Sequence, residues 1–135
     1  MTHTGSCSLI IKGNGLDFGE INERLKIEPS SVSRKGEIIS KSMGENPNDV
    51  WIYEMKLKED EEPNKVLEKL VKVLKPSASF IKTISSTGDV CLRCYIQSDY
   101  AQIFFDFSPN VIQDLAQLNI RLEVSILSWG GVEDE

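Results

Sequence analysis

The stretch SLIIKGNGLDFGEI, residues 8–21, decides the class of fold, because a strand, a turn and a helix start follow one another within it. Its beginning is mostly apolar and β-branched, which is typical of a strand, and the Gly-Asn-Gly that follows predicts a turn. Asp17 can then cap a helix, with Glu20 three residues later as in a capping box. Leu16 and Ile21 stand at the spacing of a hydrophobic staple. The stretch therefore predicts a strand joined by a tight turn to a helix.

A second stretch, residues 103–120, repeats this order nearer the other end of the chain. It begins as a strand, and Ser108–Pro109 then supplies a helix cap with a proline at the first helical position. Phe107 and Ile112 repeat the staple spacing, and Ile112 is expected to face the core with the apolar residues that follow it. We interpret the likeness to residues 9–27 as a weak internal duplication of a strand–helix–strand unit.

The patterns between and after these stretches predict the remaining elements. Apolar residues alternate in the predicted strands and recur at helical spacing in the predicted helices. The predicted strands are 50–57, a hairpin of 90–96 with 102–107, and 121–127; the predicted helix 63–75 is followed after Pro76 by a second piece capped by Ser77; Ile38-Ile39 is a possible short edge strand. The order predicts an α+β fold, with an antiparallel or mixed sheet, helices packed on one face, and a broadly ferredoxin-like arrangement.

Length and charge predict one domain without a broad basic surface. We expect a flexible N-terminus at 1–7, a single α+β domain at 8–128 and an acidic tail at 129–135. The net charge is −6, and seven of the 21 acidic residues lie at 59–62 and 133–135. The rest of the chain is nearly neutral, which argues against general nucleic-acid binding. The sequence shows neither a long apolar run nor a signal-peptide pattern, which predicts a cytoplasmic protein that does not bind membranes.

The residues that usually carry catalysis are not arranged for it. The only histidine, His3, lies near the chain end, whereas a Ser–His or Cys–His mechanism needs a fixed base. Cys91 and Cys94 have the spacing of a zinc knuckle or redox pair, but a strand would place them on opposite faces. The glycine-rich turn departs from a dinucleotide loop, because Phe18 stands where the third glycine belongs. We therefore predict no catalytic residue, metal ligand or cofactor, and the balance favours a non-enzymatic protein.

Several short motifs resemble those of a known family. They are Asp17-Phe18 at a helix start, Ile27-Glu28-Pro29 at its end, Arg34-Lys35-Gly36, a strand beginning at Trp51, and a helix like Leu115-Ala116-Gln117-Leu118-Asn119 before the last strand. Over roughly residues 8–128 the chain resembles DUF4279, a family of bacterial proteins defined by a domain of unknown function. The resemblance implies the fold described above and no particular reaction. The segment Ser40–Asp49 and the acidic tail depart from the family's pattern.

Arg34, Lys35 and Trp51 are the candidate binding residues. They lie in or directly after the irregular stretch 29–49, and long loops often carry recognition residues. Arg and Trp are also frequent hot spots of binding. Alternatively, Arg34 pairs with Glu37 and Trp51 belongs to the core. The sequence thus predicts a small interaction protein whose partner is another protein, one version being an immunity-like protein that masks a toxin. The alternative is a small-ligand-binding domain or enzyme with a pocket beside the irregular stretch.

Overall fold

The computed structural model describes residues 3–40, 44–99 and 102–128; the predicted acidic tail lies outside these ranges. The described residues form strands, four α-helices and one short 3-10 turn. They are β1 (His3–Gly13), α1 (Phe18–Leu25), β2 (Ser31–Ser33), β3 (Ile38–Ser40), β4 (Gly44–Glu45), β5 (Asp49–Leu57), α2 (Pro63–Leu74), the 3-10 turn η1 (Lys75–Ser77), α3 (Ala78–Ser85), β6 (Asp89–Ser98), α4 (Pro109–Gln117) and β7 (Arg121–Ser128).

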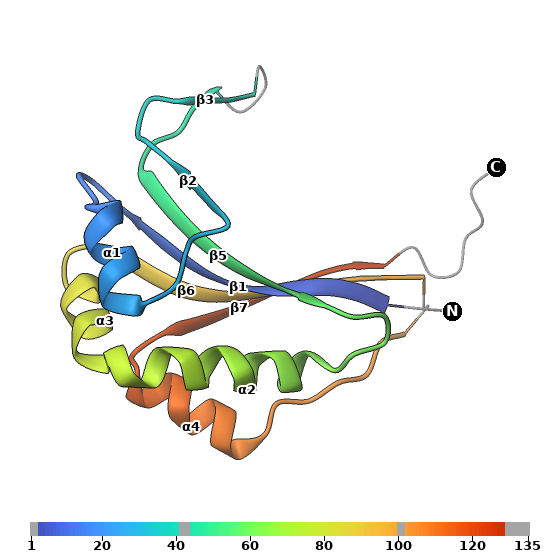
Figure 1. Cartoon of the computed structure of the whole chain (residues 1–135). Helices are drawn as coiled ribbons and strands as arrows, with labels where there is room; N and C mark the ends of the chain where they lie inside the picture. Colours follow the sequence, from blue (N-terminus) through green and yellow to red (C-terminus); the bar gives the residue numbers. More distant parts are fainter. Residues whose placement is uncertain (1–2, 41–43, 100–101, 129–135) are drawn as a thin grey trace.

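One five-stranded sheet forms the centre of the molecule, in the order β2-β5-β1-β6-β7 (Figure 1). The long strand β1 pairs antiparallel with β5 on one side and with β6 on the other. At the edges, β2 pairs antiparallel with β5, and β7 pairs parallel with β6. β3 and β4 form a separate small antiparallel pair beyond β2. The prediction of an α+β fold with a mixed sheet is therefore confirmed.

Two of the helical connections each cross over a strand that belongs to another part of the chain. α1 connects β1 to β2, which lie on either side of β5, and α2 with α3 connects β5 to β6, which lie on either side of β1. Both are split β-α-β units. α4 then connects the neighbouring parallel strands β6 and β7 at the edge. The ferredoxin-like label itself stays a prediction.

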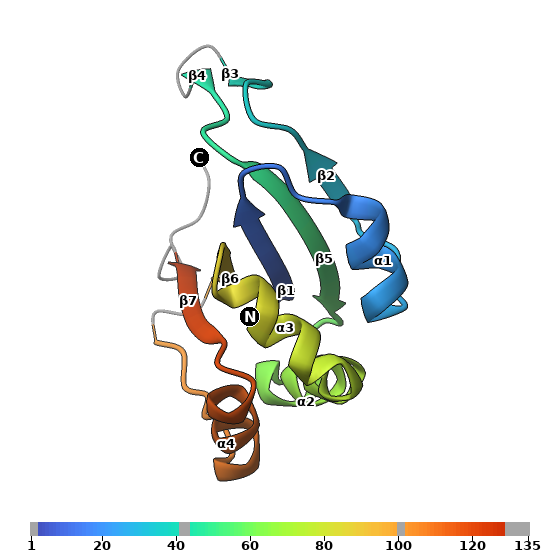
Figure 2. The same ribbon diagram turned by 90° about the vertical axis from the view of Figure 1, so that its left-hand side faces the viewer.

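The helices all lie on one face of the sheet (Figure 2). Alternate residues of β1 point toward them, so Cys7, Leu9 and Ile11 are buried in the core. Opposite them, α2 presents one apolar stripe, with Leu67 and Leu70 fully buried. The core thus lies between the sheet and the helices, and no helix of the described residues covers the other face of the sheet.

Two of the three predicted helix caps, those of Asp17 and Ser108, are confirmed. The Asp17 side chain accepts a hydrogen bond from the Glu20 backbone N–H at 3.0 Å at the start of α1. The Ser108 hydroxyl accepts one from the Val111 N–H at 3.3 Å at the start of α4, where proline takes the first helical position. These contacts satisfy N–H groups that a helix start otherwise leaves without a partner.

The predicted strand 102–107 is wrong, and with it the hairpin. Both sides of β6 are already occupied by β1 and β7, so the segment has no place beside β6 in the sheet. Its alternating pattern has another cause: Ile103, Phe105 and Phe107 are half-buried against the core, and the two phenylalanine rings meet edge to face at 5.7 Å. The second copy of the proposed duplication therefore lacks its first strand.

Three smaller differences concern single residues. The Ser77 side chain does not cap α3; its hydroxyl donates to the Arg24 carbonyl at 3.0 Å. Ile112 was expected in the core, but it is 56% exposed on α4. His3 and the residues after it belong to β1, which begins before the predicted start at Ser8.

Candidate functional site

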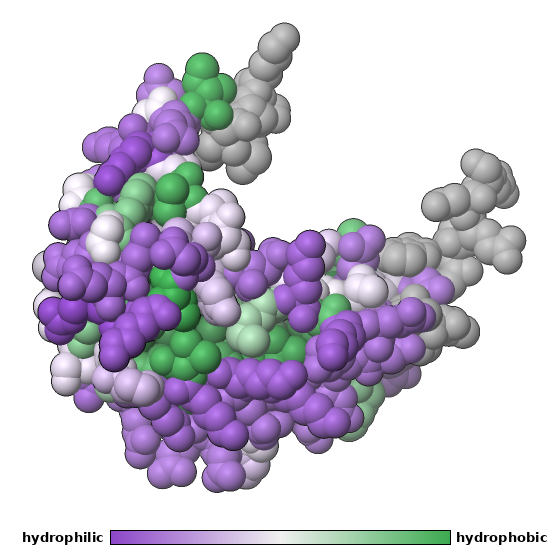
Figure 3. All heavy atoms as spheres, in the orientation of Figure 1, coloured by the Kyte–Doolittle hydropathy of each residue, from purple (hydrophilic) through white to green (hydrophobic). Residues whose placement is uncertain are grey.

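The face of the sheet that carries no helix is curved and holds a shallow hollow. The space-filling view shows the molecule hollowed between the arm that carries β3 and the opposite end of the sheet (Figure 3). The hollow has a volume of about 450 Å³, and its lining comes from the four strands other than β2 of the main sheet. The lining residues are Ser6, Ser8, Ile10, Ile52, Glu54, Arg93, Tyr95 and Ser125. We call this the open-face hollow.

Strand pairing places small residues on the floor of the hollow and larger ones on its walls. On the central strand, Ser8 lies between Glu54 of β5 and Arg93 of β6. One step further toward the start of β1, Ser6 lies between Lys56 and Tyr95. Because the side chains of neighbouring strands stand side by side on one face, a short side chain between two long ones leaves a depression.

The floor is also partly apolar. Ile10 is only 4% exposed, although it points away from the helices, and it lies between Ile52 and Cys91. It is buried but stands outside the main core cluster. The hollow therefore offers an aliphatic surface at one end and hydroxyl groups at the other.

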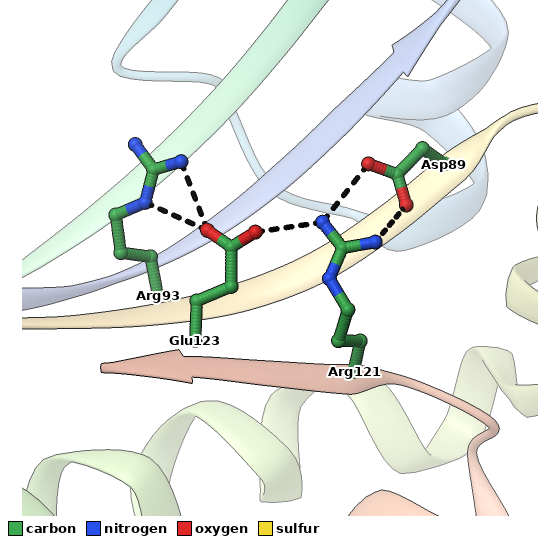
Figure 4. A network of polar contacts seen from close by, with 4 residues as sticks. All are labelled: Asp89, Arg93, Arg121 and Glu123. Carbon is green, nitrogen blue, oxygen red and sulfur yellow. Dashed lines mark hydrogen bonds and ion pairs between the residues drawn. The ribbon is translucent and has the colours of Figure 1, made fainter. Parts of the chain in front are cut away.

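An ionic network fixes one wall of the hollow (Figure 4). Arg121 of β7 donates two hydrogen bonds to Asp89, at 2.6 and 3.1 Å, and one to Glu123 at 2.8 Å. Arg93 donates two to the other oxygen of Glu123, at 3.0 and 2.9 Å. The hydrogen bonds from Arg121 and then Arg93 lower the pKa of Glu123, which keeps it ionised. The network holds the Arg93 side chain in place and neutralises much of its charge.

The opposite wall carries the carboxylate of Glu54, which does not belong to this ionic network. Within the described ranges, the Glu54 carboxylate has no hydrogen-bond or ion-pair partner; only its backbone N–H donates, to Ser30. The same ranges give no side-chain partner for Ser6, Ser8, Tyr95 and Ser125. Several polar groups therefore converge on the open-face hollow with bonding capacity left for a ligand.

The predicted binding residue Trp51 lies in the core. It is fully buried on the helix side of β5, and its indole N–H donates to the Asn22 side-chain oxygen of α1 at 2.8 Å. The core alternative for this residue was therefore the right one, and Trp51 does not form a surface with Arg34 and Lys35.

Arg34 and Lys35 surround a buried carboxylate, that of Asp49. Asp49 accepts from the Lys35 N–H at 2.8 Å, the Leu16 N–H at 2.9 Å and the Arg34 guanidinium at 3.2 Å. The hydrogen bond from the Lys35 backbone, together with those from Leu16 and Arg34, lowers the pKa of Asp49. Arg34 also donates to the Leu16 carbonyl and stacks over the Phe18 ring at 3.9 Å. The ion-pair partner of the Arg34 side chain is thus Asp49 and not Glu37. The cluster joins three segments of the chain.

The two cysteines of the Cys-x-x-Cys sequence lie on opposite faces, as predicted. Cys91 pairs with Ile10 on the open face, and Cys94 pairs with Cys7 in the core. All three thiols are free and buried, and burial raises the pKa of Cys91. Within the described residues no cluster of three or more histidine, cysteine, aspartate or glutamate side chains could hold a metal ion. No helix of the described residues is long and apolar enough to cross a bilayer.

Sequence reasoning missed the open-face residues because they come from four separate strands. Ser6 and Ser8 stand at alternate positions of a strand, which indicates one face but not its neighbours. Only the pairing brings Glu54, Arg93 and Ser125 beside them. None of the residues that line the hollow belongs to the stretch 29–49, beside which a pocket was predicted.

The mixed sheet with helices on one face defines a two-layer α+β domain. The sequence matches the family model described as a domain of unknown function, DUF4279, over residues 2–129, nearly the whole chain. The chain therefore belongs to the DUF4279 family, as the resemblance predicted. No curated protein and no solved structure matches it.

Proposed function

We propose that this chain is a small binding protein that receives a basic segment of a protein partner on the open face of its sheet. The observation that carries the proposal is the open-face hollow, with its floor at Ser6, Ser8 and Ile10. A solvated sheet face is common in antiparallel sheets. A solvated face with a hollow and several polar side chains without partners is what a binding surface requires.

Charge favours a basic partner. Glu54 supplies a carboxylate without a partner in the described ranges, and the chain as a whole carries a net charge of −6. An acidic protein attracts a basic segment from a distance, and an unpaired carboxylate at the contact gives it a fixed position.

The other lining residues complete the recognition. Ile10 and Ile52 offer an aliphatic surface to an apolar side chain, and Tyr95 belongs to a residue type enriched in interfaces. The partner segment then presents an arginine or lysine to Glu54 and an apolar residue to the two isoleucines. A toxin whose basic surface is masked by this face is one form that such a partner can take.

A charge-reversal experiment tests the proposal. Tagged wild-type protein, Glu54→Lys and Glu23→Lys are each used to capture partners from a lysate of the source cells, and the captured proteins are quantified by mass spectrometry. Glu23 is an exposed carboxylate of α1 on the helix side, so the control makes the same change in net charge away from the open face. We expect a protein that wild type and Glu23→Lys both capture, and that Glu54→Lys captures at least about tenfold less.

Two results contradict the proposal. The first is equal capture by Glu54→Lys and Glu23→Lys of every protein that wild type captures. The second is the absence of any protein enriched by wild type over empty resin. Melting curves of both variants, which alter exposed side chains, check that the fold is intact.

A further inference from the structure

A second hollow lies on the helix side of the sheet. It is beside the face of β6 that Tyr95 does not occupy. It has a volume of about 510 Å³, within the range of small-molecule sites. It lies where the start of α2, the start of β1 and the segment that follows β6 meet. Its lining residues are His3, Glu62, Pro63, Ile96, Gln102, Ile103, Phe104, Phe105 and Asp106.

The walls of this hollow are mixed, with polar and apolar surface in similar amounts. Ile96 and Pro63 are buried, and Ile103 and Phe105 are half-buried against the core. Phe104 is different, because 89% of its surface is exposed at the rim. An aromatic ring left in water beside a partly apolar hollow gains contact area when a ligand covers it.

The charges around the hollow are mostly negative. Glu62 and Asp106 line it, and within the described ranges neither carboxylate has a hydrogen-bond or ion-pair partner. Glu62 ends the acidic run that begins at Glu59, and within this run Glu61 pairs with Lys69 at 3.7 Å. His3, the other ionisable lining residue, already contacts Asp60 and the Glu61 carbonyl. The free charge at the hollow is therefore that of the two lining carboxylates.

The positive end of the α2 dipole also lies at this hollow and by itself favours an anion. Glu62 occupies the N-cap position of α2, however, and its carboxylate stands beside the dipole. An anionic ligand would meet Glu62 and Asp106 together, and like charges in contact oppose binding.

We infer that this hollow binds an amphipathic organic cation, a compound with an aromatic or aliphatic body and an ammonium group. The body lies against Phe104, Ile103 and Phe105, and the ammonium group lies toward Glu62 and Asp106. Carboxylates pair with ammonium groups, and the faces of phenylalanine rings attract cations. The site is separate from the open-face hollow and does not depend on the protein partner proposed above.

A titration with matched probes tests this inference. Full-length ¹⁵N-labelled protein is titrated with 2-phenylethylammonium, and in parallel with 3-phenylpropionate, which has a similar body and the opposite charge. We expect saturable amide shifts at residues 102–106 and around Glu62 with the ammonium probe below about 10 mM, and at least tenfold weaker binding of the carboxylate probe. The double variant Glu62→Gln, Asp106→Asn should lose the preference for the ammonium probe. Phe104→Ala should bind the ammonium probe more weakly than wild type does. Glu28→Gln, an exposed acid after α1, serves as the control and should bind as wild type does.

Three outcomes overturn the inference. They are equal binding of the two probes, saturable shifts confined to residues outside the lining, and no saturable shift with the ammonium probe up to about 10 mM. The first removes the role of the carboxylates, the second places the site elsewhere, and the third leaves the hollow without affinity for this class of ligand.

Discussion

Asp49 is the residue on which the arrangement of the first half of the chain depends most directly. Its carboxylate accepts from backbone groups of Leu16 and Lys35 and from the Arg34 side chain, so one group holds the turn before α1 and the loop after β2 against β5. Polar groups buried in this way are costly to leave without partners. The same contacts hold the Arg34 guanidinium against Asp49, although half of the Arg34 side chain stays exposed.

Asp49→Asn should lower the melting temperature at pH 7 by several degrees, because an amide accepts fewer and weaker bonds than a carboxylate. The folded-state pKa of Asp49 is lowered from its ordinary value of 3.8. Its stabilising contribution is therefore complete above about pH 4 and is lost as the pH falls through the folded pKa. Melting curves from pH 7 to pH 2 should show the gap between wild type and variant narrowing in acid. A gap that stays constant would show that the charge of Asp49 is unimportant.

Trp51 gives a second prediction for a single residue. Trp51→Phe removes the hydrogen bond to Asn22 and leaves empty volume in the core, so it should lower the free energy of unfolding by roughly 1–3 kcal/mol. Urea unfolding measures this change. Phe104→Ala is the control, since a residue exposed at 89% should change stability by no more than about 0.5 kcal/mol. Equal effects of the two substitutions would contradict the placement of Trp51.

The elements themselves were predictable wherever their signals are local. The start of α1 needs only Asp17 and Glu20, and the start of α4 needs only Ser108 and Pro109, all within one helical turn. The strand predicted at 102–107 was wrong because strand pairing is not a local property of the sequence. An alternating apolar pattern shows that one side of a segment is buried, but it does not show whether the backbone has a neighbour in the sheet.

The two caps give a prediction for the helices. Asp17→Ala and Ser108→Ala should each cost about 1 kcal/mol of stability, within a range of roughly 0.5–2. Ser79→Ala, at an exposed position of α3, should be neutral or slightly stabilising because alanine is the better helix former. Thermal melting of the three variants measures the differences. If the cap variants melt at the same temperature as the Ser79→Ala protein, the side-chain contacts at the helix starts do not contribute to stability.

At the scale of the whole molecule, the pairing of distant strands creates the open-face hollow. Ser8, Glu54 and Arg93 are neighbours on the open face, yet each comes from a different part of the sequence. The alternation within a strand could be predicted, but strand order could not, because it depends on which helices cover which face. The sequence therefore predicted a binding site at Arg34, Lys35 and Trp51, in or directly after the irregular stretch 29–49.

The distribution of the cysteines over the two faces of the sheet gives a prediction for the intact protein. Cys7 and Cys94 lie in the core, and Cys91 is buried on the open face. A hydrogen bond with Cys94 and then burial raise the pKa of Cys7, and burial raises the pKa of Cys91. The native protein should therefore react slowly with a thiol reagent such as 5,5′-dithiobis(2-nitrobenzoate), and the urea-unfolded protein should release three equivalents rapidly. A chelator should leave the melting curve unchanged. Rapid reaction of the native protein, or a melting temperature lowered by the chelator, would contradict this account of the cysteines.

The central position of β1 has a consequence for synthesis on the ribosome. β1 is made first, but its partners β5 and β6 begin 36 and 76 residues after it ends, at Asp49 and Asp89. At about 5–20 residues per second, roughly 4–15 s pass before the second of these partners begins to be made. During that time the apolar run Leu9–Ile11 has no complete sheet around it, and such runs bind other chains when exposed. We therefore expect the nascent chain to be most prone to bind chaperones that hold extended apolar segments until β6 completes the pairing of β1.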